Sequence, residues 1–255
     1  MHNSGGGTEL RLLKGFTLSE VLITLGIIGV VAAVTLPSII QKIDDRQNIA
    51  HWKKIYSAIN QAFNKSISEG YIPCDKNERN LSCIDQVVWT RQTKMNDEFI
   101  YRMLSNFNVT NVCNTTGNTN CNRFPNWAVS YGNTPKTLKG GSVGSYNFHY
   151  IEGRLATGEL IMFGDSHGGP WISVDVNGFR KGPDKIGKDI FIMKVYDDFI
   201  RPLGADGTFN KEANGEICGC GEEYGTETDV YFAQGAGTGE VVSGGCCSAY
   251  YLLEK

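Results

Sequence analysis

Proline is scarce in this sequence, with 7 among 255 residues, and no dense block of lysine and arginine occurs. The formal net charge is -3. Without a basic patch, nothing indicates a nucleic-acid partner. Internal repeats and long low-complexity tracts are also missing. The hydrophobic content of 41% is ordinary for a globular protein, and the length suffices for one sizeable core.

Histidine is also rare, and this bears on two enzyme-like strings. The four histidines are His2, His51, His149 and His167. GGSVG (Gly140 to Gly144) matches a nucleophile elbow but lacks the strand before it and the helix after it. GDSHGG (Gly164 to Gly169) has no later histidine to act as an esterase base, and a metallophosphatase needs more His and Asp clusters. We expect both strings to be glycine-rich turns, and we expect no enzyme.

Long apolar runs are confined to one place, KGFTLSEVLITLGIIGVVAAVTLP (Lys14 to Pro37). Val21 to Leu36 contains no charge. Counted from Phe16, a helix here would be about 31 Å long, enough to span a hydrocarbon core. Glu20 lies near its start, although an unpaired carboxylate in lipid is unfavourable by a few kcal/mol.

Basic residues precede the apolar run. Arg11 and Lys14 predict a cytoplasmic N-terminus, with everything after Pro37 outside. A secretory signal peptide is the alternative, but no A-x-A-like cleavage site follows.

The apolar pattern continues as an amphipathic helix to about Ser68, and Glu69-Gly70 supplies a stop. Pro37 should kink the helix, because its ring removes a backbone hydrogen bond. The apolar stripe comprises Ile43, Ile49, Trp52, Tyr56, Ile59, Phe63 and Ile67.

The stretch KGFTLSEVLITLGIIGVVAAVTLP resembles the N-terminal signal of type IV pilins and of the pseudopilins of type II secretion. The matching features are Lys14-Gly15, Phe16, Glu20, the apolar run and Pro37. The resemblance implies that a prepilin peptidase cleaves between Gly15 and Phe16 and methylates the new N-terminal phenylalanine. LGADG (Leu203 to Gly207) is a looser match to major pseudopilins.

The resemblance also gives Glu20 a role. In a filament of staggered helices, Glu20 of one subunit can approach the Phe16 amine of its neighbour, and each charge makes the other tolerable in apolar surroundings. Helix packing would supply the binding energy. Small residues would permit close approach: Gly26, Gly29, Ala32 and Ala33. The alternative is that Glu20 only marks the headgroup boundary of a membrane anchor.

After the helix we expect an irregular region and then a sheet. A short helix is expected at Asn96 to Ser105. Four strands follow from Ser145, namely SYNFHYI, RLATGELIMFGD, WISVDVNG and DIFIMKVY, with turns at Gly153, Gly158, Gly168-Gly169 and Asn177-Gly178. The predicted class is therefore α+β, with a long N-terminal helix packed on a small antiparallel sheet, as in pilins.

Eight cysteines lie on the predicted outer side, where an even count favours disulfides. Short spacing suggests Cys74 with Cys83 and Cys113 with Cys121. Cys218 and Cys220 would reach Cys246 and Cys247. A zinc site of these last four cysteines is an alternative, although C-x-C with C-C departs from the usual spacing.

Oxygen ligands for calcium occur in the turn after the third strand. They are Asp175, Asn177, Asp184 and Asp189. Some pseudopilins bind calcium in their C-terminal region, so the resemblance raises this possibility. The competing interpretation is that these side chains make turns by bonding their own backbone, and we expect that interpretation and no other cofactor.

These observations predict a pilin-like structural subunit of a type IV pilus or type II secretion pseudopilus. The alternative is a disulfide-rich minor pilin that acts as an adhesin or substrate-binding module. The expected partners are other pilin subunits, prepilin peptidase, the assembly machinery of the inner membrane and the membrane itself. The subunit would cross the inner membrane once and then enter a periplasmic or extracellular filament.

The predicted divisions of the chain follow from these assignments. They are the leader (1–15), the membrane and assembly helix (16–38), its amphipathic continuation (39–69), an irregular cysteine-containing region (70–144), the sheet (145–198) and a disulfide-rich C-terminal segment (199–255).

Overall fold

The computed structural model describes residues 16–74, 83, 95–114, 151–166, 169–178, 181–182, 184–205 and 247–253. The chain divides into two compact units, Met1–Asp44 and Asp45–Lys255. Helix α1 (Leu18–Ser68) has 51 residues, begins in the first unit and ends in the second. The prediction of a long N-terminal helix is confirmed.

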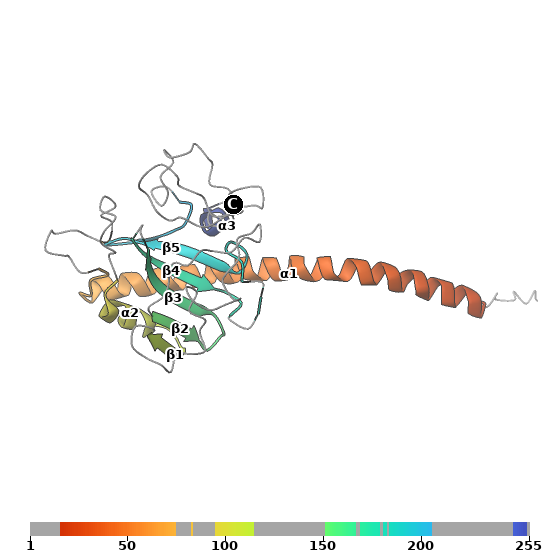
Figure 1. Ribbon diagram of the computed structural model, residues 1–255, viewed down its shortest axis with the longest axis horizontal. Coiled ribbons are helices and arrows are strands. Elements are labelled where there is room, and N and C mark those ends of the chain that lie inside the picture. The colour runs from red at the N-terminus through yellow and green to blue at the C-terminus, as the bar shows by residue number, and fades with distance from the viewer. Residues whose placement is uncertain are drawn as a thin grey trace, which may run out of the picture. The chain divides into compact units, whose positions relative to one another are not determined.

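The sheet of the second unit is an antiparallel meander of six strands in the order β1-β2-β3-β4-β5-β6 (Figure 1). Each strand pairs with its neighbour in sequence, so the connections need no crossover. The α+β class is thereby confirmed. The strands are β1 (Val109–Asn114), β2 (Ile151–Leu155), β3 (Leu160–Ser166), β4 (Gly169–Asp175), β5 (Ile190–Val195) and β6 (Ile200–Pro202).

The strand predictions were right in outline and wrong in detail. Most of SYNFHYI lies outside the described residues. Strand β1 was missed, because only Cys113 of its residues is fully buried and an apolar alternation is absent. Strand β6 was missed because three residues are too few for a periodic pattern.

One face of the sheet packs against the second half of α1. Trp52, Ile59 and Phe63 have no exposed surface and share a core with alternate residues of the strands. The Trp52 ring stacks on Phe191 of β5, with centroids 4.9 Å apart. The predicted amphipathic stripe therefore faces the sheet from Trp52 to Ile67, since burial of apolar side chains is the main stabilising term. The prediction is wrong for Ile43, which is 48% exposed.

Helix α1 ends where the sequence predicted. Gly70 has φ +91°, a left-handed conformation that costs glycine nothing. Its N–H donates to the carbonyl of Ile67, and the N–H of Tyr71 donates to the carbonyl of Ser66. These two bonds make a Schellman cap, which satisfies carbonyls left open at the end of the helix.

Helix α2 (Asp97–Leu104) confirms the short helix expected at Asn96 to Ser105. The Asn96 side chain caps it by accepting a hydrogen bond from the N–H of Glu98. Gly153, predicted as a turn, instead lies inside β2 beneath this helix. A Cβ at Gly153 would lie 2.6 Å from Cδ2 of Leu104, so a larger residue there would require the Leu104 side chain to shift.

Helix α3 (Cys247–Leu253) joins the C-terminal end of the chain to the core. The indole N–H of Trp52 donates to the carbonyl of Ser248 at 2.9 Å, and the Ser248 hydroxyl accepts from the N–H of Ile192 at 2.9 Å. One serine thus connects α1, α3 and β5. Its burial is compensated because both polar groups are hydrogen-bonded.

Candidate functional site

The N-terminal end of α1 forms a capping box. The N–H and the hydroxyl of Thr17 both donate to the Glu20 carboxylate at 2.8 Å, and the N–H of Glu20 donates to the Thr17 hydroxyl at 3.2 Å. This arrangement satisfies backbone donors that would otherwise lack partners. Glu20 therefore has a local role within one subunit that the sequence interpretation did not include. Gly15 lies outside the described residues, and Phe16 directly precedes this cap with 88% of its surface exposed.

The apolar segment of α1 is exposed along its length. It is long and apolar enough to cross a membrane, and none of its most apolar window is buried. The two glycines predicted to permit helix contact, Gly26 and Gly29, face open space, because a Cβ at either position would meet no atom within 4 Å. Among the described residues, packing therefore requires neither glycine.

Pro37 lies inside α1, which continues as a helix on both sides of it. Nearby hydroxyls bond to backbone carbonyls, with Thr35 donating to Val31 at 2.9 Å and Ser38 donating to Thr35 at 2.8 Å. Such bonds reduce the cost of burying hydroxyls in an apolar environment. The kink at Pro37 stays a prediction.

The cysteine pattern is resolved in part. Cys74 and Cys83 form a disulfide, as their spacing suggested, and both are buried. Cys113 and Cys247 are each in a disulfide as well, with partners other than one another. Their expected partners, together with the other cysteines of the C-terminal pairing, lie outside the described residues: Cys121, Cys218, Cys220 and Cys246. Because a bridged Cys247 cannot bind zinc as a thiolate, the alternative of a four-cysteine zinc site is wrong.

The structure brings the four calcium candidates into one loop after β4. Asp175 accepts hydrogen bonds from the N–H groups of Asn177 and Gly178. Asp189 accepts from the N–H groups of Asp184 and Lys185, at 2.8 and 2.6 Å. The Asn177 amide N–H also donates to Asp189. The oxygens of Asp175 and Asp189 are therefore directed at the backbone of their own loop.

This loop fits a calcium ion poorly. Three carboxylate oxygens already accept backbone hydrogen bonds, whereas calcium needs six to eight oxygens turned toward one point. Across the ranges described above, no group of three His, Cys, Asp or Glu side chains converges as a metal site. Burial raises the pKa of Asp175 to about 7 and that of Asp189 to about 6, with mutual repulsion adding to the effect at Asp175. The geometry at Asp175 is that of an Asx turn, whereas Asp189 bonds to the backbone of residues before it in the loop.

Of the two enzyme-like strings, the structure describes only part of one. In GDSHGG, residues 164–166 end β3, and Ser166 pairs with Gly169 of β4. The string is therefore the connection of an antiparallel hairpin, as the turn interpretation expected. GGSVG lies outside the described residues.

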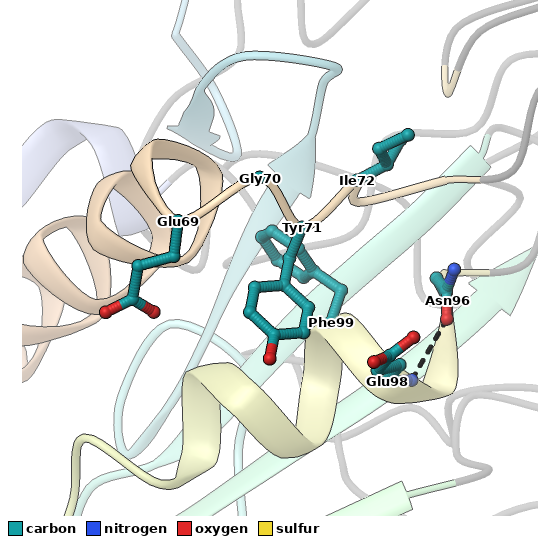
Figure 2. A pocket seen from close by; sticks show the side chains of 7 residues that line it. All are labelled: Glu69, Gly70, Tyr71, Ile72, Asn96, Glu98 and Phe99. Carbon is teal, nitrogen blue, oxygen red and sulfur yellow. Dashed lines mark hydrogen bonds between the residues drawn. The ribbon is translucent and has the colours of Figure 1, made fainter.

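A feature that sequence reasoning missed is a half-open pocket between the end of α1 and the start of α2. Its volume is about 290 Å³, and Figure 2 shows the residues that line it. The side chains come from the turn after α1 and from the first turn of α2. They are Glu69, Tyr71, Ile72, Asn96, Glu98 and Phe99, together with Gly70. No spacing along the sequence signals this pocket, because its two walls are joined only by the tertiary fold.

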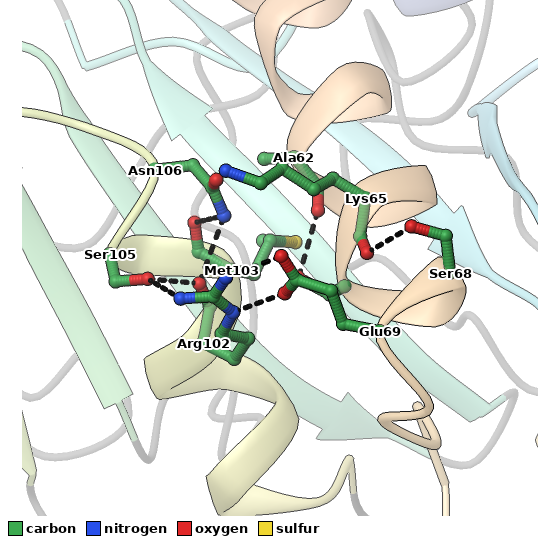
Figure 3. Close-up of polar contacts among 9 residues, drawn as sticks. Ala62, Lys65, Ser68, Glu69, Arg102, Met103, Ser105 and Asn106 are labelled. Carbon is green, nitrogen blue, oxygen red and sulfur yellow. Dashed lines mark hydrogen bonds and ion pairs between the residues drawn. The ribbon is translucent and has the colours of Figure 1, made fainter.

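One wall of the pocket is held in place by an ion pair. Figure 3 shows Arg102 of α2 donating two hydrogen bonds to Glu69, from Nε and from a terminal nitrogen. Arg102 also lies 6.0 Å from the centre of the Tyr71 ring. Its hydrogen bond lowers the pKa of Glu69, which keeps that carboxylate ionised. Such paired Arg–carboxylate contacts fix geometry, so Arg102 ties the turn after α1 to α2.

Glu152 of β2 is a second feature without a sequence signal. Its side chain is on the sheet face away from α1, where its cross-strand neighbours are Cys113 and Met162. It is 1% exposed, and its Oε2 has no hydrogen-bond partner among the described residues. Burial raises the pKa of Glu152 to about 8.

Comparison with known proteins gives one match. The family described as the prokaryotic N-terminal methylation motif matches residues 11–36. No curated protein and no solved structure is significantly similar to the chain. The matched residues include Lys14-Gly15, Phe16, Glu20 and most of the exposed apolar segment of α1. The chain therefore carries, at residues 11–36, the prepilin-type signal of type IV pilins and pseudopilins, ahead of a pilin-like α+β fold.

Proposed function

We propose that this protein is a structural subunit of a type IV pilus or of a type II secretion pseudopilus. The observation that carries the proposal is the methylation motif at residues 11–36, continuous with an apolar segment of α1 that is exposed in the part of the chain that the structure describes. A membrane accounts for that surface before assembly, and helices of neighbouring subunits account for it afterwards.

Processing would occur at the end of the leader. Prepilin peptidase hydrolyses the peptide bond between Gly15 and Phe16, and methylation follows on the new amine. That amine is then one residue before the capping box of Thr17 and Glu20. The positive charge of the amine adds to the positive end of the helix dipole, so both are stabilised by a nearby carboxylate.

Assembly would use the same carboxylate. Glu20 of one subunit pairs with the Phe16 amine of the next, which fixes the axial stagger of the helices. Gly26 and Gly29 let neighbouring helices approach, consistent with the open space around both in the single subunit. The sheet unit would lie outside the membrane, as Arg11 and Lys14 predict.

Substitutions at Glu20 separate its charge from its role in the cap. Glu20→Gln keeps a capping oxygen but removes the charge, whereas Glu20→Ala removes both. Leader cleavage and membrane insertion should continue in each variant, and filaments should be lost in each, because an unpaired amine in the helical core costs ~3–5 kcal/mol per subunit. Glu20→Asp should give an intermediate yield, since it keeps the charge and shortens the reach.

Thr17→Ala is the matched control for the cap. It removes the hydroxyl and leaves the carboxylate, so filaments should persist. Sheared filaments and processed membrane subunits are measured by immunoblot in each strain. Normal filaments from Glu20→Gln with none from Glu20→Ala would show that the cap, and not the charge, is what assembly needs. The ratio of this subunit to others in the filaments also distinguishes a major component from the scarce subunit that the minor-pilin alternative requires.

A further inference from the structure

The pocket at the end of α1 contains two carboxylates, of which only one is paired within the described part of the subunit. Glu69 is already paired with Arg102, but Glu98 is exposed and forms no hydrogen bond or ion pair through its carboxylate with any described residue. In Figure 2 the Glu98 side chain lies at the pocket beside Asn96. The pocket therefore offers negative charge at one side.

Apolar side chains also line the pocket. Ile72 is 57% exposed, the largest exposed fraction among the large hydrophobic residues described in the second unit. The Tyr71 ring and the buried Phe99 continue this surface. An apolar wall next to a free carboxylate matches the chemistry of a lysine side chain, which has a four-carbon stem and a charged end.

The chain itself presents such side chains on α1. From Arg46 to Ser68 the helix contains no Asp or Glu, while it contains Lys53, Lys54 and Lys65 besides Arg46. Lys53 and Lys54 are exposed neighbours with no ion pair to any residue in the described ranges. Two adjacent ammonium groups without a counter-charge gain most from an acidic partner on another molecule.

The lysines and the pocket cannot meet within one subunit. Lys53 and Glu69 are 16 residues apart on the same helix, which is roughly 24 Å at about 1.5 Å per residue. A contact between these complementary charges is therefore possible only between copies of the chain. A contact between two different surfaces of identical subunits is heterologous, and repeating it gives an open helical assembly.

We propose that the pocket formed by Tyr71, Ile72, Glu98 and Phe99 receives Lys53 or Lys54 of a neighbouring copy of this chain. The lysine stem lies against Ile72 and Tyr71, and its ammonium group pairs with Glu98. Arg102 positions the pocket by holding Glu69. This inference rests on the proposed filament function and adds a second contact, outside the membrane, to that made by the N-terminal helices.

Photo-crosslinking in the full-length protein tests the contact directly. Ile72 is replaced by p-benzoylphenylalanine, filaments are irradiated, and crosslinked peptides are identified by mass spectrometry. The expected product joins position 72 to the Lys53-Lys54 peptide of a second copy. Crosslinks only to lipid, to another protein or to a different segment of this chain would overturn the proposal.

Charge reversal gives an independent result. Glu98→Lys should lower the yield of sheared filaments about tenfold or more, because like charges then face each other. Adding Lys53→Glu and Lys54→Glu to the same chain should restore much of the yield. Asp198→Lys is the matched control, since Asp198 is exposed and outside the pocket, and it should assemble as the parent does.

The outcomes separate this inference from the proposed function. Equal filament yields from Glu98→Lys and the parent overturn the pocket contact and leave the filament function standing. Absence of the parent protein from any filament overturns both. The level of processed subunit in membranes and the Cys74–Cys83 disulfide report whether each variant has folded.

Discussion

Glu152 lies in the middle of β2, with its carboxyl group on a buried and largely apolar sheet face. Its pKa of about 8 lies above the ordinary value of 4.5, so the folded protein holds a proton that the unfolded chain releases. Stability therefore falls as pH rises from about 4.5 to 8. Asp175 and Asp189, with pKa values of about 7 and 6, act in the same direction.

Glu152→Gln should stabilise the sheet unit at neutral pH. Glutamine needs no protonation when buried, so the gain is up to about 3 kcal/mol at pH 7. We expect the difference from the parent to be near zero at pH 4 and to grow toward pH 8, as measured by urea unfolding across that range. A gain of the same size at pH 4 and pH 7 would contradict the assignment of a raised pKa to this carboxyl.

Lys194 affects how the stability of the sheet unit depends on pH above about pH 8. Burial lowers its pKa to about 8 from 10.5, and its ammonium group lies 5.6 Å from the centre of the Trp171 ring. The folded protein then binds fewer protons than the unfolded chain between pH 8 and 10.5, so stability should rise with pH in that window. Lys194→Met should abolish this rise without altering the acidic limb. A parent whose stability keeps falling above pH 8 would refute the expectation.

Helix α2 and strand β2 meet at Gly153, and this contact sets their spacing. Gly153→Ala would place a methyl group 2.6 Å from Cδ2 of Leu104, so Leu104 must move. We expect a loss of about 1–3 kcal/mol in the free energy of unfolding, the usual cost of overpacking a core. The double variant Gly153→Ala with Leu104→Ala should lose less than the sum of the two single losses. Strict additivity would show that the two residues are not in contact.

For the glycines of the apolar segment we expect the opposite of Gly153, namely an effect on assembly and none on stability. Gly26→Leu and Gly29→Leu should leave unfolding of the sheet unit unchanged, because no atom of the described residues lies within 4 Å of a Cβ at either position. Filament yield should fall, since leucine keeps neighbouring helices apart. Val30→Leu, on the same exposed segment, is the size-matched control and should assemble normally. Full assembly of both glycine variants would remove these residues from the helix contact.

The elements differ in how far the sequence predicts them. Helix α1 was predictable because its apolar pattern extends over many turns and Gly70 marks its end. Helix α2 was predictable because Asn96 is a capping residue and the apolar residues after it recur at helical spacing. Strands β1 and β6 were not predictable, since a six-residue edge strand and a three-residue strand carry little pattern. Gly153 was wrongly predicted as a turn, because a glycine in a sequence indicates a turn and a close approach between two elements equally well.

The candidate sites divide in the same way. The prepilin-type signal is local in sequence and was found from Gly15, Phe16 and Glu20. The pocket beside Glu98 and the buried Glu152 depend on which strands and helices become neighbours, and no local pattern specifies that. The capping box of Thr17 and Glu20 could have been found, because T-x-x-E before an apolar run is its sequence signature.

The whole molecule combines an exposed apolar helix with a disulfide-containing α+β unit. The apolar segment of α1 in its first unit is exposed among the described residues, and its second unit has a buried core of its own. A membrane-inserted precursor that is cleaved and then packed into a filament accounts for both units. The central claim is therefore that the mature subunit begins at Phe16 and resides in a filament.

Intact-mass measurement of the subunit in sheared filaments tests this claim most directly. We predict a mass equal to residues 16–255, with one added methyl group that fragmentation places on the amine of Phe16. The mass should also be lower by two hydrogens for each disulfide, including Cys74–Cys83. A chain that retains Met1 to Gly15 in cells with active prepilin peptidase, or one that is absent from the filaments those cells produce, would contradict the account.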